Sequence, residues 1–215
     1  MGKANQGVFG SFTGKVGNVV GRVRQGQQVY CIYQPNVGNP QTPAQQANRM
    51  KITLLSQLGS VLLNAIQDGF KQLDGYQKGS PYSAFVGYNC KVAQPITGAY
   101  PNLEIDHAKV AVSEGSLINP YNCQGSVDSF NIVLTWADNS GMSNALATDQ
   151  LCVVVLNKTK NASVYFPYGA KRSDRTDTVT CPSSWSSDSV EVWAFMAREN
   201  GTLMSKTMYI GSFTL

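Results

Sequence analysis

The stretch Ser189-Val190-Glu191-Val192-Trp193-Ala194-Phe195-Met196-Ala197 decides the fold of the larger part of this chain. It is rich in β-branched and aromatic residues and contains neither glycine nor proline, so it predicts a β-strand. Side chains of a strand alternate between its two faces. The alternation leaves two apolar sets, either of which suits a core: Val190, Val192, Ala194 and Met196 on one face, and Trp193 with Phe195 on the other.

The same period of two recurs along the sequence from about Leu103 to the C-terminus. Ile132, Leu134 and Trp136 alternate on one such run, and we expect Trp136 to be a core residue. Turn-rich sequence such as Asn139-Ser140-Gly141 separates the runs. Seven short strands in about 110 residues are typical of a β-sandwich of the immunoglobulin or fibronectin type III kind, which we predict for residues 100–215. The expected strands are 108–113, 127–136, 150–157, 162–166, 176–180, 189–197 and 203–213.

Residues 42–99 have a helical period instead. Thr42 is placed as an N-cap, Pro43 at the first helical position and Gln45 as the partner in a capping box. Apolar residues then recur every three or four positions. A second helix is expected from the cap Ser80 to a stop at Pro95, so the segment predicts a helical pair. The first stripe consists of Leu55, Leu58, Leu62, Ala65 and Ile66.

Residues 1–41 predict a glycine-rich β arm followed by a linker. Five glycines lie between Gly7 and Gly21, and each costs a helix about 1 kcal/mol relative to alanine. Strands are therefore expected at 16–24 and 28–34, joined across Gln25-Gly26-Gln27. A lone hairpin is marginally stable, so the arm must dock on something. The whole chain is expected to be α+β, with an arm, a helical pair and a sandwich.

The charge of the chain is distributed unevenly. The net charge is +4, but the first 67 residues carry six basic residues and no acidic one, and the first carboxylate is Asp68. We interpret the arm as a surface that binds a partner. Six positive charges are few for a nucleic-acid arm, so an acidic protein surface is favoured over nucleic acid. The expected contact residues are Lys3, Lys15, Arg22, Arg24, Tyr30 and Tyr33.

The sequence contains no recognisable catalytic, metal-binding or cofactor-binding set. His107 is the single histidine, and Asp106 beside it is the one candidate to orient it as a base. The five cysteines stand far apart and none form a C-x-x-C pair, so we expect no zinc site and mostly buried thiols. Lys171-Arg172 and Arg175 are interpreted as a solvated basic turn. We predict that the protein is not an enzyme.

Composition and termini predict a soluble protein made in the cytoplasm. The sequence begins with no apolar run of the kind found in signal peptides, and no stretch reaches the roughly 20 apolar residues that cross a bilayer. Charged residues make up 14% of the chain, well below the roughly 25% usual in soluble domains. Such a weakly charged surface suits a protein that packs against neighbours.

The stretch from Gly7 to Gly21, followed by Gln41-Thr-Pro-Ala-Gln-Gln-Ala-Asn-Arg49, resembles an uncharacterised family from Bacteroidetes bacteria and their phages. Tyr100-Pro101-Asn102 and the stretch from Leu134 to Gly141 extend the resemblance over most of the chain. Where that family commonly has Trp-Lys-Gly, this chain has Arg24-Gln25-Gly26. The resemblance implies a lineage and brings no catalytic residues.

Together these observations predict a structural assembly protein, present in multiple copies and bound to protein partners through its arm. The resemblance implies a phage or prophage virion component made in the bacterial cytoplasm. The alternative is a binding module in the bacterial cytoplasm or at the cell surface, whose sandwich recognises glycan or protein. Tyr165, Tyr168 and Trp185 would then form an exposed aromatic platform.

Overall fold

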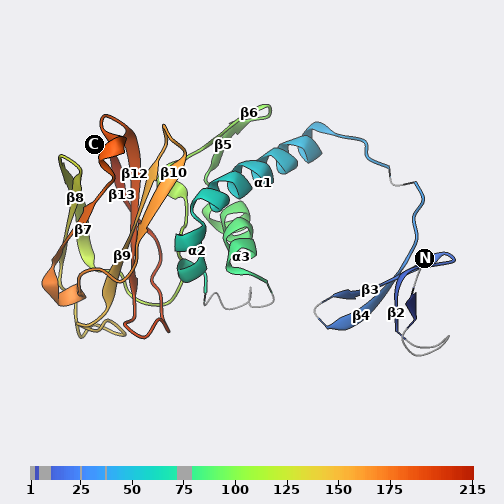
Figure 1. The fold of residues 1–215 in the computed structure, drawn as a ribbon, viewed down its shortest axis with the longest axis horizontal. Helices are drawn as coiled ribbons and strands as arrows, with labels where there is room; N and C mark the ends of the chain where they lie inside the picture. Colours follow the sequence, from blue (N-terminus) through green and yellow to red (C-terminus); the bar gives the residue numbers. More distant parts are fainter. Residues whose placement is uncertain (1–2, 5–10, 25, 37, 72–78) are drawn as a thin grey trace. The chain divides into compact units, whose positions relative to one another are not determined.

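The computed structural model describes residues 3–4, 11–24, 26–36, 38–71 and 79–215. The chain divides into two compact units, Met1–Thr42 and Pro43–Leu215 (Figure 1). It is a mixed α+β protein whose sheets are antiparallel. The helical segment and the later strands, which the sequence analysis treated separately, lie in the second unit and share a hydrophobic cluster.

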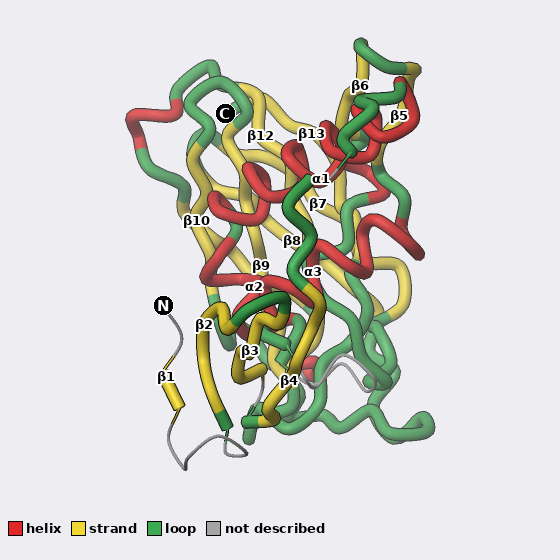
Figure 2. Tube along the Cα trace, turned by 90° about the vertical axis from the view of Figure 1, so that its right-hand side faces the viewer, coloured by secondary structure: helices red, strands yellow, loops and turns green. Residues whose placement is uncertain are grey.

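The N-terminal unit is a single four-stranded antiparallel sheet in the order β1-β2-β3-β4 (Figure 2). Its predicted hairpin is confirmed as β3 and β4, but the expected strand 16–24 is broken by a turn at Gly17, whose φ is +58°. A glycine tolerates this left-handed conformation, so the chain reverses there and adds β2. The strands are β1 (Lys3–Ala4), β2 (Phe12–Val16), β3 (Val19–Arg24) and β4 (Gln27–Ile32).

Two of the three described α-helices begin at the predicted prolines. Helix α1 spans Pro43–Val61, α2 spans Leu63–Gly69 and α3 spans Pro81–Tyr88. Ser80 caps α3, because its hydroxyl accepts a hydrogen bond from the Ser83 amide at 3.2 Å. The π-helix η1 (Asn89–Ala93) continues α3 to the predicted stop before Pro95.

The strands of the second unit form three antiparallel sheets. One has the order β10-β9-β12-β13, a second has the order β11-β8-β7, and β5 pairs with β6. The predictions for 150–157, 162–166, 176–180 and 189–197 are confirmed. The strands are β5 (Ile96–Ala99), β6 (Asn102–Ile105), β7 (Tyr121–Asp128), β8 (Asn131–Ala137), β9 (Gln150–Asn157), β10 (Ala162–Phe166), β11 (Thr176–Thr180), β12 (Ser189–Ala197) and β13 (Met208–Thr214).

Three strand predictions were wrong in extent or kind. The expected strand 127–136 is the β7–β8 hairpin, which turns at Ser129, and the strand expected from residue 203 begins at Met208. Residues 108–113 form no strand. Their backbone bonds to side chains instead, since the Asn89 amide pairs with Ala111 in both directions (2.9 and 3.0 Å) and the Thr207 hydroxyl accepts from Val112 at 2.8 Å.

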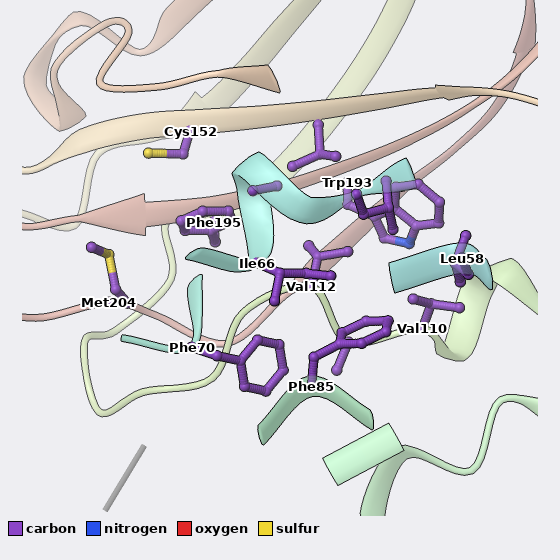
Figure 3. Close-up of a cluster of buried hydrophobic side chains, with 14 of the residues drawn as sticks. Leu58, Ile66, Phe70, Phe85, Val110, Val112, Cys152, Trp193, Phe195 and Met204 are labelled. Atoms are coloured by element: carbon purple, nitrogen blue, oxygen red, sulfur yellow. The ribbon is translucent and has the colours of Figure 1, made fainter. Parts of the chain in front are cut away.

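Strand β12 is buried on both faces, so both of its apolar sets lie in a core. Trp193, Phe195 and Ala197 pack in one cluster with residues of α1, α2 and α3, including Leu58, Ile66 and Phe85 (Figure 3). Val190, Val192, Ala194 and Met196 pack in a second cluster with the sheet β11-β8-β7, which includes Trp136 as predicted. The second unit therefore has three layers: helices, a central sheet and a second sheet (Figure 1).

A buried charged network lies at the end of the unit where β9 begins. The predicted solvated turn is corrected here, because the Arg172 side chain is fully buried. One guanidinium nitrogen of Arg172 lies 3.2 Å from the Asp149 carboxylate, and another donates to Asn139 at 2.6 Å. Arg198 approaches the other oxygen of Asp149 at 2.7 Å. Asp149 thus compensates two cations, the fully buried Arg172 and the partly buried Arg198.

Asp149→Asn should lower the free energy of unfolding by about 3–5 kcal/mol, because it leaves the buried Arg172 guanidinium uncompensated. Urea denaturation followed by tryptophan fluorescence measures the change. The matched control is Asp106→Asn, which breaks the exposed pair with Lys109 and should cost about 1 kcal/mol or less. Equal losses in the two variants would contradict this account of the network.

Candidate partner-binding surface

The register of the N-terminal sheet sorts its side chains onto two faces. Directly opposed residues of antiparallel strands share a face, as do residues two positions apart along a strand. Lys15 lies opposite Val20, and Val20 lies opposite Cys31, so these three share one face. Val16, Val19 and Ile32 are opposed in the same way and lie on the other face.

One face carries the described cations of the unit. Arg22 and Arg24 follow Val20 at intervals of two, and they lie on the face of Lys15. All three side chains belong to exposed residues. The Lys15 ammonium lies 3.4 Å from the centre of the Tyr33 ring, a cation–π contact. Thus Lys15, Arg22, Arg24 and Tyr33, all predicted contact residues, come together on a surface that we call the cationic face.

One predicted contact residue lies on the other face. Tyr30 lies opposite Gly21, and so it belongs to the other side of the sheet. The alternation of β4 separates it from Tyr33, and its role in partner contact stays a prediction. Lys3 is opposite Thr13 in the β1–β2 pair.

The opposite face is apolar and exposed, and we call it the apolar face. Ile32 is 76% exposed, Val23 58% and Val16 52%. Such large exposed fractions on neighbouring strands form one continuous patch, and exposed apolar patches mark interaction sites. Its apolar members are Phe12, Val16, Val19, Val23, Tyr30 and Ile32, and the polar Gln28 lies on the same face opposite Val23.

Gly21 shapes the centre of the apolar face. A Cβ at this position would lie 2.3 Å from the Phe12 carbonyl oxygen and 2.9 Å from the Phe12 ring. The absence of a side chain lets the Phe12 ring lie over β3, where it contacts the Tyr30 ring at 5.1 Å between centroids. Gly21 is the one buried residue among the described residues of the N-terminal unit. The sheet therefore has surfaces but no interior.

Sequence reasoning named the strand residues of the arm but missed the apolar face. The signal was present as a period of two in Val19, Val23, Tyr30 and Ile32. The sequence pattern does not give the register across the two turns, and the register decides whether residues of different strands lie on the same face. A turn at Gly17 and another at Gly26, both with positive φ, set that register.

His107 does not sit in a catalytic arrangement. Asp106 accepts a hydrogen bond from the Ala108 amide at 3.2 Å and pairs with Lys109 at 3.1 Å, so it caps a turn and pairs with a lysine. Within the described part of the chain, Nδ1 of His107 has no hydrogen-bond partner. Burial lowers the pKa of His107, which favours the uncharged ring.

A cleft of about 600 Å³ lies beside His107, and the one charged side chain that lines it is already paired. Lys158, one of its lining residues, bonds to Glu191 at 2.6 Å, and Tyr209 donates to the other oxygen of Glu191 at 2.6 Å. Burial acts to raise the pKa of Glu191, but these two hydrogen bonds outweigh it and the pKa lies below its ordinary value. Five of its ten lining residues are apolar: Leu54, Leu58, Val61, Ile105 and Leu156.

The thiols show no reactive or metal-binding grouping among the described residues. All five cysteines are unbridged, and no cluster of three or more His, Cys, Asp or Glu side chains able to hold a metal is found across the described ranges. Burial raises the pKa of Cys123, Cys152 and Cys181 to about 11, so these thiols stay protonated at neutral pH. Cys31, on the cationic face, is exposed.

The aromatic platform considered for glycan binding is not formed. Trp185 is only 5% exposed and packs in the cluster between the two larger sheets. Tyr165 is half-buried and donates a hydrogen bond to Asp68 at 3.0 Å. The loop position of Trp185 had suggested exposure, but the short 3₁₀ turn Ser183–Trp185 directs the indole inward.

The burial of the thiols predicts an order of reactivity. In the native protein at pH 8, Cys31 should react first with a disulfide reagent such as DTNB, because it is exposed while Cys152 and Cys181 are buried with raised pKa values. Cys31→Ser should remove the fast phase. Unfolding should release five thiols from the wild-type chain and four from the variant. Cys90 and Cys123 are partly exposed and should react more slowly than Cys31, so a fast phase of unchanged amplitude in Cys31→Ser would contradict the exposure of Cys31.

Three further findings concern the helices of the chain and its similarity to known proteins. Among the described residues, no helix is both long and apolar enough to cross a bilayer. A family model described as "Family of unknown function (DUF6266)" matches residues 11–211. No curated protein matches the chain.

Proposed function

Because the chain belongs to this family of unknown function, we propose its role from its geometry: a non-enzymatic structural protein that joins a larger assembly through its N-terminal sheet. The observation that carries the proposal is the N-terminal sheet itself, with two exposed faces and Gly21 as its one buried described residue. A single sheet has no core to stabilise it. A bound partner would supply the missing layer.

The cationic face indicates the chemistry of that partner. Lys15, Arg22 and Arg24 point from one surface, and the sequence offers no carboxylate before Asp68. An acidic protein surface complements this face and would speed docking. Nucleic acid would use the same cations, but three described cations on a face are few for a nucleic-acid groove, and the Tyr33 ring is already covered by Lys15.

The second unit suits the outward part of an assembly because its core is complete. Both hydrophobic clusters consist of residues beyond Thr42. We also propose that its two larger sheets form a sandwich related to the immunoglobulin and fibronectin type III domains. Counted from β7 as the first strand, the first pairs with the second, the second with the fifth, the third with the sixth and the sixth with the seventh. These are pairings of the immunoglobulin fold. The fourth strand, β10, differs because it pairs with the third and so joins the larger sheet.

The setting of the assembly is proposed from the sequence. The resemblance of the opening glycine motif and of the stretch Gln41–Arg49 to proteins of Bacteroidetes and their phages favours a phage or prophage virion. The protein would be made in the bacterial cytoplasm and incorporated in multiple copies. The weakly charged surface, with 14% charged residues, suits dense packing.

Deletion of residues 1–34 should leave a soluble, folded protein that no longer joins particles, because both hydrophobic clusters lie in the second unit. The measurement is sucrose-gradient sedimentation of tagged full-length and shortened chains from cells that produce the particles. Circular dichroism of the shortened chain controls for folding. Co-sedimentation of the shortened chain with the particles would refute the anchoring role.

Charge reversal should separate an acidic partner from other modes of binding. The double variant Arg22→Glu and Arg24→Glu should reduce binding of full-length protein to immobilised poly-glutamate by about tenfold or more at low salt. The control is Lys109→Glu with Lys206→Glu, two exposed lysines of the second unit that change net charge equally. Equal losses in both double variants would show that net charge, and not this face, determines binding.

A further inference from the structure

One edge of the N-terminal sheet is formed by β4 (Gln27–Ile32). Among the described residues, β4 pairs with β3 and has no strand on its other side. An edge strand presents backbone N–H and C=O groups that a further strand can bind. The question is which groups of β4 point away from β3 and what would pair with them.

The backbone of Gln28, Tyr30 and Ile32 points to the open side. The Tyr33 amide donates to the Asn18 carbonyl at 2.7 Å, so this pair is hydrogen-bonded. In an antiparallel ladder, hydrogen-bonded and non-hydrogen-bonded pairs alternate. Val19 and Ile32 therefore form a non-hydrogen-bonded pair, and the even-numbered residues of β4 direct their backbone outward. Their side chains lie on the apolar face.

This edge lacks the features that usually prevent strand pairing. Natural edge strands carry charges, prolines or bulges that block association. The sequence Gln27-Gln-Val-Tyr-Cys-Ile32 has no charge and no proline, and its pairing with β3 runs without a register shift. The cations of the neighbouring strand β3, Arg22 and Arg24, stand on the opposite face from Tyr30.

We propose that β4 pairs antiparallel with β4 of a second copy of this chain, across a twofold axis at Tyr30. In this register Tyr30 opposes its counterpart and Gln28 opposes Ile32, so every outward-pointing residue of the strand meets another. A copy is favoured as occupant because the uncharged strand opposes only itself and no like charges meet. A twofold contact needs only one self-complementary surface.

The pairing would also join the apolar faces. Opposed residues in antiparallel strands share a face, so Tyr30 and Ile32 of both copies lie on the same side of one continuous sheet. The cationic faces are joined on the other side. This inference is independent of the acidic partner, because it uses the edge and the backbone of β4 and none of the cations tested by charge reversal.

Sedimentation velocity of the full-length chain tests the pairing with two matched variants. Tyr30→Lys places two ammonium groups against each other on the axis and should weaken the dimer by about tenfold or more. Val23→Lys adds the same charge to the same face but on the inner strand β3, and the dimer should persist. A monomeric wild-type chain would overturn the proposal. Equal weakening of the dimer in both variants would also overturn it, because that result indicates packing through the whole apolar face.

Cross-linking at Cys31 supplies a second readout that does not depend on the stability of either variant. In the proposed register the two Cys31 residues are diagonal neighbours about 7–8 Å apart, so a short bis-maleimide should link two wild-type copies. Cys31→Ser should abolish the link, and Val23→Lys should retain it. Packing of two apolar faces would hold the Cys31 side chains on opposite outer surfaces, and failure to cross-link a wild-type dimer would overturn the edge pairing.

Discussion

The burial of β9 and β12 on both faces is the constraint on which the second unit depends. Every residue from Val190 to Ala197 is buried, and the neighbouring strand β9 is buried from Leu151 to Asn157. A strand apolar on both faces must be covered twice, because exposed apolar surface costs about 25 cal/mol per Å². The helices α1 to α3 cover one face and the sheet β11-β8-β7 covers the other. The three layers are thus a consequence of two strands.

The same constraint directs polar groups to the ends and margins of the central sheet. Glu191, the one acidic residue in β12, is satisfied by Lys158 and Tyr209. At the start of β9, Asp149 holds the buried Arg172. Buried charges are tolerated only when paired and hydrogen-bonded. The apolar core determines how the strands pack, and these polar networks hold the loops around it in place.

Sequence patterns predicted the features whose physical cause is local. Pro43 and Pro81 mark the helix starts because a proline fixes φ and lacks the amide that the first turn leaves unpaired.

Features that depend on distant partners were missed. Residues 108–113 have a strand-like sequence, but Asn89 and Thr207 bind their backbone. Arg172 was expected in solvent, since nothing in its neighbourhood along the chain indicates Asp149. In the arm, four of the expected contact residues lie on one face and Tyr30 lies on the other, a division that the sequence could not predict because the register was unknown.

The two units solve the problem of apolar surface in different ways, and the difference bears on assembly. In the second unit each apolar strand face finds its cover within the chain, so the unit is complete. In the N-terminal unit, Gly21 and the turn at Gly17 allow a thin sheet whose cationic face, apolar face and β4 edge are separated by the geometry of strands. Because side-chain alternation divides the faces and backbone alternation defines the edge, a change at one surface leaves the others intact. In the proposed assembly role, such a sheet would offer partners three separate surfaces.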